Sequence, residues 1–275
     1  MKVCYYYQTF VGLHQILKQA QEVSLVIVSS LHFDEGHIYL NDNEPTDPLF
    51  DPMWTEIQEA HYEGTEIHLM LGGAGGAYQE LFAHFDLYYP LLVQMIRDRP
   101  YVHGINLDIE EDVLLADVKH LIRRIKTDCG SDFKITMAPV QESLMTDGPG
   151  MGGFSYKELV KSAEGPWIDA FNVQCYGSFS YDTIHTIVQN GYPPETLVMG
   201  MMSGQFTKET FPQALHEVQK IVDAYPSFRG VYDWEYYDAP PGGPADPSVF
   251  AREFAKIQPE AKIQPEAKIQ PEAKI

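Results

Sequence analysis

Eight short apolar segments, each followed by an amphipathic stretch, recur along this chain of 275 residues. Continuous apolar runs of this kind are typical of strands that are buried on both faces, as they are in a parallel sheet. We predict strands at residues 3–7, 25–31, 66–71, 102–109, 133–139, 170–176, 197–202 and 230–234. Helices are expected at residues 11–21, 54–62, 89–98, 113–128, 156–163, 181–190, 211–225 and 247–255.

This alternation predicts a (β/α)8 TIM barrel of the α/β class, because eight strand–helix units in about 250 residues match its dimensions. A doubly wound open sheet is the alternative. It is less favoured, because no Gly-x-Gly-x-x-Gly turn follows the first predicted strand. Long loops at residues 37–52, 141–153 and 238–246 follow strand ends, so in a barrel they belong to the face where active sites form.

The C-terminal segment differs from the rest of the chain, because it repeats the sequence Ala-Lys-Ile-Gln-Pro-Glu. A proline in each repeat interrupts a helix, and one isoleucine per repeat is too little apolar surface for a core. We therefore expect a catalytic barrel over residues 1–256. An extended low-complexity tail without chemistry is expected over residues 257–275.

Composition narrows the classes of partner. The formal net charge of -20 argues against nucleic acid or an anionic membrane as a partner, because both are polyanions. The three cysteines match no zinc motif and cannot form a complete disulfide set, so we expect no metal and no cofactor. Neither a signal peptide nor a span of about twenty apolar residues is visible. We expect a soluble monomer, and leave a cytoplasmic or a secreted location open.

One predicted strand ends in a row of polar side chains. Asn106, Asp108 and Glu110 share a face of the strand, because alternate side chains point the same way. Such a row is costly to bury unless its members hydrogen-bond to one another or serve chemistry. A strand end in water explains the row equally well, so the spacing alone leaves both interpretations open.

The segment around this row, Tyr-Val-His-Gly-Ile-Asn-Leu-Asp-Ile-Glu at residues 101–110, resembles the Asp-x-x-Asp-x-Asp-x-Glu strand of glycoside hydrolase family 18. That family contains chitinases and endo-β-N-acetylglucosaminidases. Further segments resemble its strand motifs in the correct chain order, and the pattern is most similar to the small hevamine-like chitinases. These segments are residues 69–78, 136–139, 172–176 and 230–234.

The resemblance implies a retaining, substrate-assisted hydrolysis of β-1,4-linked N-acetylglucosamine glycosides, in chitin oligosaccharides or in the chitobiose core of N-glycans. In this mechanism the 2-acetamido group of the substrate replaces an enzyme nucleophile, an exception to the usual pair of carboxylates. Glu110 would be the general acid and base. Asp108 would orient the acetamide and raise the proton affinity of Glu110, while Tyr176 would hydrogen-bond the acetamide carbonyl.

The resemblance also implies substrate contacts. Trp234 would stack under the sugar ring, although core packing alone would explain a tryptophan there. For Tyr5, packing in the core is as good an explanation as a substrate contact. By the same resemblance, cis peptide bonds are expected before Phe33 and after Trp234. The full set of implied substrate-binding residues is Trp234, Gln174, Asn106, Gly73, Phe33, Tyr5 and Met137.

Three positions in two motifs depart from the family pattern. Asn106 and His103 stand where the family has aspartates, and Gly177 stands where an Asn or Asp usually follows the tyrosine. Asn106 can donate a hydrogen bond to Asp108 but cannot accept its proton, so the strength of catalysis stays open. The alternative function is a catalytically weak or inactive chitinase-like carbohydrate-binding protein. A barrel enzyme of unrelated, phosphate-using chemistry is the least favoured alternative.

Overall fold

The chain folds into a closed barrel of parallel strands in a computed structural model that describes residues 1–18 and 22–259. The ring closes because β1 pairs with both β2 and β9. The barrel strands are β1 (Lys2–Tyr7), β2 (Leu25–Asp34), β4 (Glu66–Gly72), β5 (Gly104–Asp108), β6 (Lys134–Met137), β7 (Ala170–Gln174), β8 (Leu197–Met202) and β9 (Gly230–Trp234). The predicted (β/α)8 TIM barrel is therefore confirmed.

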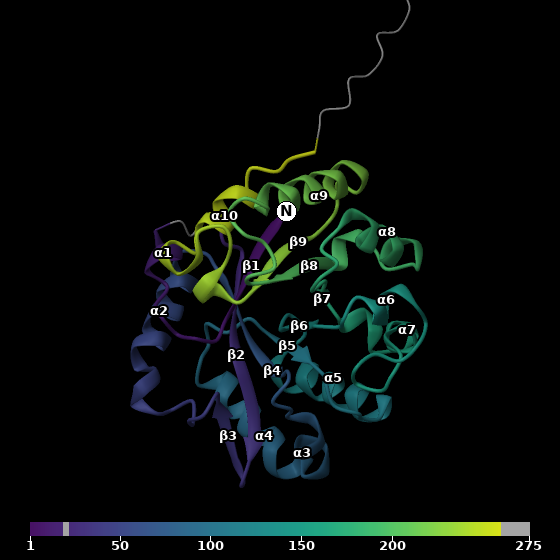
Figure 1. Ribbon diagram of the computed structural model, residues 1–275. Helices are drawn as coiled ribbons and strands as arrows, with labels where there is room; N and C mark the ends of the chain where they lie inside the picture. The colour runs from purple at the N-terminus through teal and green to yellow at the C-terminus, as the bar shows by residue number, and fades with distance from the viewer. Residues whose placement is uncertain (19–21, 260–275) are drawn as a thin grey trace, which may run out of the picture.

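Helices surround the strands, as Figure 1 shows. They are α1 (His14–Leu17), α2 (Asp51–Tyr62), α3 (Tyr78–Ala83), α4 (Phe85–Arg97), α5 (Leu115–Cys129), α6 (Glu142–Met145), α7 (Tyr156–Lys161), α8 (Tyr181–Gln189), α9 (Phe211–Ala224) and α10 (Val249–Phe254). Short 3-10 turns lie at Pro48–Phe50, Gly165–Trp167, Pro194–Thr196, Tyr236–Asp238 and Gly243–Ala245.

The strands divide their side chains between two apolar layers, because successive residues point to opposite faces. In β1, Cys4 and Tyr6 belong to the cluster inside the barrel, together with Met70 and Tyr232. Tyr5 and its alternate neighbours belong to the larger cluster between the strands and the helices. Polar residues of the inner layer therefore gather along the barrel axis.

Some local predictions need correction. The predicted loop at residues 37–52 begins with a strand, β3 (His37–Leu40), which pairs antiparallel with the long end of β2. The helix predicted at residues 11–21 is only the short α1, and residues 19–21 lie outside the described part of the chain. Helices α3 and α6 were not expected from the sequence.

Packing against the barrel continues to the last residues that the structure describes. Ile257 is buried in the outer cluster, and Gln219 Nε2 donates a hydrogen bond to the carbonyl of Gln258 at 2.9 Å. Packing on the barrel thus extends slightly past residue 256. The rest of the predicted tail, residues 260–275, lies outside the described residues.

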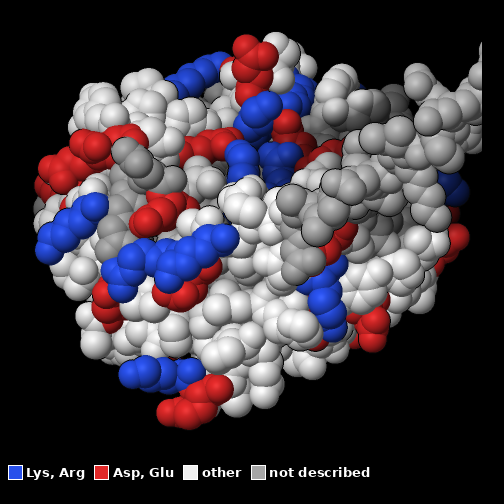
Figure 2. Space-filling view, turned by 90° about the horizontal axis from the view of Figure 1, so that it is seen from above, with Lys and Arg blue, Asp and Glu red and all other residues white. Residues whose placement is uncertain are grey.

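The surface carries charges of both signs. On the face in Figure 2, Lys and Arg side chains lie next to Asp and Glu side chains. The whole chain has 39 acidic and 19 basic residues, so the excess is negative. Within residues 1–18 and 22–259, no helix combines the length and the apolar character that crossing a bilayer requires.

Candidate active site

A cavity of about 280 Å³ opens at the carboxyl ends of the barrel strands, the end at which barrel enzymes carry their active sites. Its residues come from the ends of β4, β5, β7, β8 and β9, from the residues that directly follow β4, β5 and β7, and from the loop between α6 and α7. They are Met70, Gly73, Ala74, Asp108, Glu110, Met151, Gln174, Tyr176, Met202 and Trp234.

The carboxyl groups of Asp108 and Glu110 meet at the bottom of this cavity. The Gln174 amide links them, because its Nε2 lies 3.1 Å from Asp108 Oδ1 and 3.3 Å from Glu110 Oε1. The same nitrogen donates to the Ala138 carbonyl at 2.9 Å, which fixes the orientation of the amide. Burial raises the pKa of Asp108 well above its ordinary value, and the neighbouring Glu110 raises it further. Asp108 therefore keeps its proton to a higher pH than an isolated aspartate would.

Asn106 lies one layer below this pair, in the barrel interior. Its Oδ1 accepts a hydrogen bond from the Tyr6 hydroxyl at 3.0 Å, and its Nδ2 donates to Thr136 Oγ1 at 2.9 Å. Asn172 Nδ2 in turn donates to the Tyr6 oxygen at 3.0 Å. The sequence suggested that Asn106 can donate a hydrogen bond to Asp108. In the structure its amide donates to Thr136 instead, which corrects that expectation. The buried amide supports the floor and does not contact the Asp108 carboxylate.

Aromatic side chains form one wall of the cavity. Tyr176 and Tyr232 place their hydroxyl oxygens 3.3 Å apart, and burial raises the pKa of Tyr176 above its ordinary value. The Tyr176 hydroxyl therefore stays protonated and is available as a donor. Trp234 is half-buried and packs on the ring of Tyr6, with 5.2 Å between ring centroids. This contact holds one face of the indole in place.

Two loops at the cavity are joined by Glu111, the residue after Glu110. Its Oε2 accepts hydrogen bonds from the backbone N–H groups of Ala77 at 2.5 Å and Tyr78 at 2.6 Å, at the start of α3. A carboxylate at a helix N-terminus satisfies backbone donors that have no partner within the helix. The contact fixes the loop that carries Gly73 and Ala74 against the end of β5.

The structure brings six of the predicted site residues together at the cavity: Glu110, Asp108, Tyr176, Trp234, Gln174 and Gly73. Gly73 has a φ of 87°, and a Cβ there would lie 2.7 Å from Met70 Cε, so a larger residue would disturb the wall. The catalytic and binding roles of these residues stay predictions.

Four predicted substrate contacts do not line the cavity. Asn106 lies below it, as described above, and the other three, Tyr5, Met137 and Phe33, are corrected here. Tyr5 is completely buried, and its hydroxyl donates to the Pro247 carbonyl at 2.8 Å. Met137 is also completely buried, and Phe33 packs against Tyr88 in the outer cluster. Tyr5 and Met137 point outward because inward-pointing side chains occupy the alternate positions of their strands. Phe33 lies beyond the irregularity of β2 between Val28 and Leu31, which shifts this alternation, and it pairs there with Ile38 of β3.

The predicted cis peptide bonds are partly found. The bond between Trp234 and Glu235 is cis, as expected. The bond before Phe33 is not among the cis bonds of the described chain, and the cis bond in β2 joins Ser29 to Ser30.

Sequence reasoning missed several residues of the site. Tyr6 reaches Asn106 from inside the barrel, although three consecutive tyrosines gave no sign of which one points inward. Met151 and Met202 line the cavity but resemble ordinary loop and strand residues in the sequence. Glu111 looked like one more residue of an acidic run.

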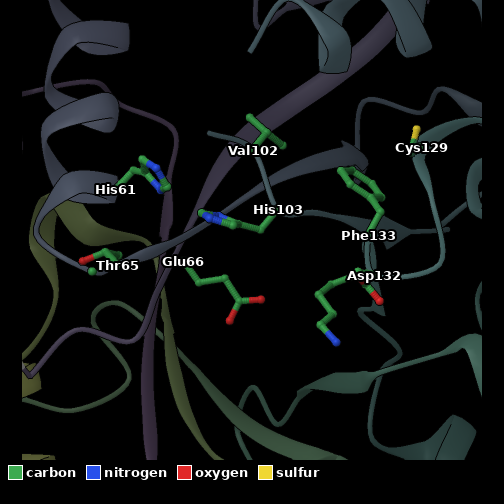
Figure 3. Close-up of a pocket in the computed structure, with 10 residues that line it drawn as sticks. His61, Thr65, Glu66, Val102, His103, Cys129, Asp132 and Phe133 are labelled. Carbon is green, nitrogen blue, oxygen red and sulfur yellow. The ribbon is translucent and has the colours of Figure 1, made fainter. Parts of the chain in front are cut away.

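A second, larger cavity of about 570 Å³ lies at the opposite end of the barrel (Figure 3). His61 and His103 lie beside each other there, with ring centroids 4.9 Å apart. Glu66 pairs with Lys2 Nζ at 2.8 Å and with His68 Nε2 at 3.0 Å. The Glu66 carboxylate is thus already paired within the protein. In the described part of the chain, no three His, Cys, Asp or Glu side chains come together as a metal site would require.

Solved structures similar to this chain share the barrel over nearly its whole length. A fungal endo-beta-N-acetylglucosaminidase from glycosyl hydrolase family 18 has a TM-score of 0.83 and 29% identity, covering 94% of this chain and 98% of its own. A chitinase from Aspergillus fumigatus has a TM-score of 0.80 and 32% identity, covering 92% and 97%. A family 18 chitinase from Pseudoalteromonas aurantia shares the fold, with a TM-score of 0.71 and 16% identity, covering 93% and 99%. No protein-family model and no curated protein sequence matches the chain.

Proposed function

Because the chain belongs to glycoside hydrolase family 18, we propose that it hydrolyses β-1,4-linked N-acetylglucosamine glycosides with retention of configuration. Chitin oligosaccharides and the chitobiose core of N-glycans are the two candidate substrates. The observation that supports this proposal best is the Asp108–Glu110 pair, which shares one cavity with Tyr176 and Trp234. One protonated carboxyl beside an aromatic floor is what cleavage of a sugar acetal requires.

In the proposed first step, Glu110 donates its proton to the glycosidic oxygen as the bond from that oxygen to the anomeric carbon breaks. The carbonyl oxygen of the substrate's own 2-acetamido group attacks the same carbon and forms an oxazolinium ring. In the second step, Glu110 removes a proton from water while the water oxygen opens this ring. Two displacements at one carbon leave its configuration unchanged.

The surroundings of Asp108 favour this route over attack by an enzyme carboxylate. Asp108 is only 5% exposed, and its raised pKa makes it a poor anionic nucleophile. A carboxyl in that state can instead bind and orient the acetamide N–H. Tyr176 keeps its proton and can donate a hydrogen bond to the acetamide oxygen, which brings that oxygen into line with the anomeric carbon.

Turnover by the wild type and by Glu110→Gln tests the proposal on chitin oligosaccharides and on a high-mannose glycopeptide. We expect the wild type to cleave at least one of them, and the variant to be slower by about a thousandfold or more. Glu63→Gln, on the exposed end of α2, is the matched control and should retain full activity. NMR measurements during the reaction should show that the first anomer released is β.

Absence of turnover in both proteins would contradict the enzymatic proposal. A carbohydrate-binding protein would then be the better interpretation, and calorimetric titration with the same oligosaccharides would identify it. Product analysis by mass spectrometry separates the two substrate classes, because a cut between the two core sugars of an N-glycan leaves one N-acetylglucosamine on the peptide, whereas a cut in a chitin oligosaccharide gives two shorter oligosaccharides.

A further inference from the structure

Two exposed methionines form walls of the cavity that contains Glu110 and Trp234. Met151 is 40% exposed and Met202 is 43% exposed, and both line this cavity. The chain has ten methionines, and most are buried. Six are at most 4% exposed: Met53, Met70, Met95, Met137, Met199 and Met201. An exposed methionine is therefore unusual in this molecule, and two of them meet at one cavity.

The position of Met151 is set by a tight turn over Gly150–Gly153. Gly153 donates to the Gly150 carbonyl at 3.0 Å, and Val113 donates to the Gly152 carbonyl at 3.0 Å. The second bond fastens the turn to the segment that follows Glu110 and Glu111. A Cβ at Gly152 would lie 2.6 Å from the Phe154 ring, so the turn requires glycine there. The backbone is therefore fixed on both sides of Met151, the one residue of the turn that has a side chain.

The position of Met202 is set by its strand. Met202 is the last residue of β8 and lies opposite Trp234 in the ladder with β9. Its carbonyl accepts a hydrogen bond from Gln205 at 3.0 Å, and the next residue, Ser203, donates to the Trp234 carbonyl at 2.7 Å. The backbone is held on two sides while the side chain stays exposed beside the indole.

We propose that Met151 and Met202 are substrate-contacting residues that set the specificity of the cleft. This inference rests on the proposed function, because it takes a sugar as the occupant. The C–H groups on the faces of a pyranose ring need apolar partners, and Trp234 supplies one such surface. A thioether side chain is unbranched and polarisable, so it adapts to ring orientations that a rigid aromatic wall would reject. The two methionines thus favour tolerance of different groups next to the cleaved bond.

The same assignment makes the cleft sensitive to peroxide. Hydrogen peroxide transfers one oxygen atom to the methionine sulfur, giving the sulfoxide, and leaves as water. The sulfoxide is polar and needs hydrogen-bond partners, so it makes a poor wall for a sugar face. Buried methionines react slowly, and oxidation therefore falls first on Met151, Met202 and the exposed Met1.

Binding measured in a Glu110→Gln background tests the assignment apart from catalysis. With a tetramer of β-1,4-linked N-acetylglucosamine as the probe, Met151→Gln and Met202→Gln should each weaken the Kd by about tenfold, the loss expected for one buried apolar contact. Met→Leu at either position should change the Kd by less than about threefold, because the wall stays apolar. Leu87→Gln, on the 51% exposed Leu87 of α4, is the matched control and should leave the Kd unchanged.

The outcomes separate this assignment from the proposed enzymatic function. Unchanged Kd values for the two Gln variants, with melting temperatures equal to the parent's, would overturn the assignment even if the wild type cleaves its substrate. Weakened binding by these variants together with an inactive wild type would overturn only the enzymatic proposal. A parent protein that binds neither the tetramer nor the high-mannose glycopeptide would contradict both.

Mild peroxide treatment gives a second test. The Glu110→Gln protein should lose affinity for the tetramer as peptide mass spectrometry detects sulfoxide at Met151 and Met202. The Met151→Leu, Met202→Leu double variant should keep its affinity while Met1 is still oxidised, so Met1 reports on the dose. Equal loss of affinity in both proteins would overturn the role of the two side chains.

Discussion

The two ends of the barrel stabilise opposite protonation states of an acidic side chain. At the amino ends of the strands, Glu66 is bonded to His68 and to Lys2, and these partners hold its pKa well below the ordinary value. At the carboxyl ends, Asp108 is buried beside another acid, Glu110, and its pKa is well above the ordinary value. The same kind of side chain is stabilised as an anion at one end and as a neutral acid at the other.

The opposite pKa shifts of Glu66 and Asp108 suggest a structural role for the first and a chemical role for the second. An acid that is paired with cations stabilises the fold and has little tendency to exchange its proton. Two acids that share a site are unfavourable for stability, and such arrangements are found mainly where a proton must be moved. We therefore expect the chemistry in the smaller of the two cavities, although the larger one contains more histidines.

For the comparison of the two ends, the largest expected effect comes from Asp108→Asn, which removes the buried acid of the pair. We expect kcat to fall by about a hundredfold or more, because the substrate acetamide and Glu110 both lose a carboxyl partner. At the same time the folded protein should become more stable near neutral pH, because a buried acid is replaced by a neutral amide. Turnover and thermal unfolding of the same preparation check both effects.

The difference in stability between the wild type and Asp108→Asn should grow as the pH rises. A raised pKa in the folded state means that the folded protein keeps a proton which the unfolded chain releases, so the free energy of unfolding falls as the pH rises. The fall is about 1.4 kcal/mol for each pH unit between the unfolded and the folded pKa. Wild type and Asp108→Asn should therefore have similar stability below about pH 4 and differ more as the pH rises. A gap that narrows with rising pH would contradict the raised pKa.

A smaller effect, on stability alone, is expected from Glu66→Gln at the other end. Loss of the anion leaves His68 and Lys2 without their partner, which should lower the free energy of unfolding by about 1–3 kcal/mol near neutral pH. Because the pKa of Glu66 is lowered in the folded state, this loss should shrink as the pH falls below about 4. Urea unfolding measures it. A large change in kcat would mean that the two ends are coupled.

The smallest expected effect comes from Glu111→Gln, at the edge of the chemical end. The amide binds the N–H groups of Ala77 and Tyr78 less strongly than the carboxylate does, so the Gly73 loop should loosen. We expect kcat/KM to fall by about threefold to tenfold, with a loss of about 1 kcal/mol in stability. Asp86→Asn, in the first turn of the neighbouring α4, is the matched control, and kcat/KM should not change there.

Most of the fold could be predicted, because barrel strands are apolar on both faces and read as continuous runs. The predicted bounds of β8 and β9 are those of the structure. Helix α3 could not be predicted, since the group at its start is Glu111, which lies 34 residues further along the chain than Ala77. Strand β3 forms only because β2 extends beyond the barrel and offers it an edge.

The site could be predicted where spacing or a charged residue marks it. Asp108 and Glu110 are unusual in an apolar strand, and Gln174, Tyr176 and Trp234 end strands that resemble known motifs. The sequence could not show which side of β1 faces the barrel interior, because Tyr5, Tyr6 and Tyr7 are the same residue type. The positions of Met151 and Met202 at the cavity could not be predicted either, since the exposure of an apolar side chain is evident only in the folded chain.

The position of Trp234 gives the protein an optical reporter of its own cleft. Of the three tryptophans in the chain, Trp167 lies on the surface, and Trp54 packs under Arg99, with 4.1 Å from the guanidinium carbon to the ring centroid. Only Trp234 lines the cavity of Glu110. A sugar that covers this indole should shift its emission while the other two signals stay constant. Occupancy of the cleft can thus be followed by intrinsic fluorescence, without a label and without turnover.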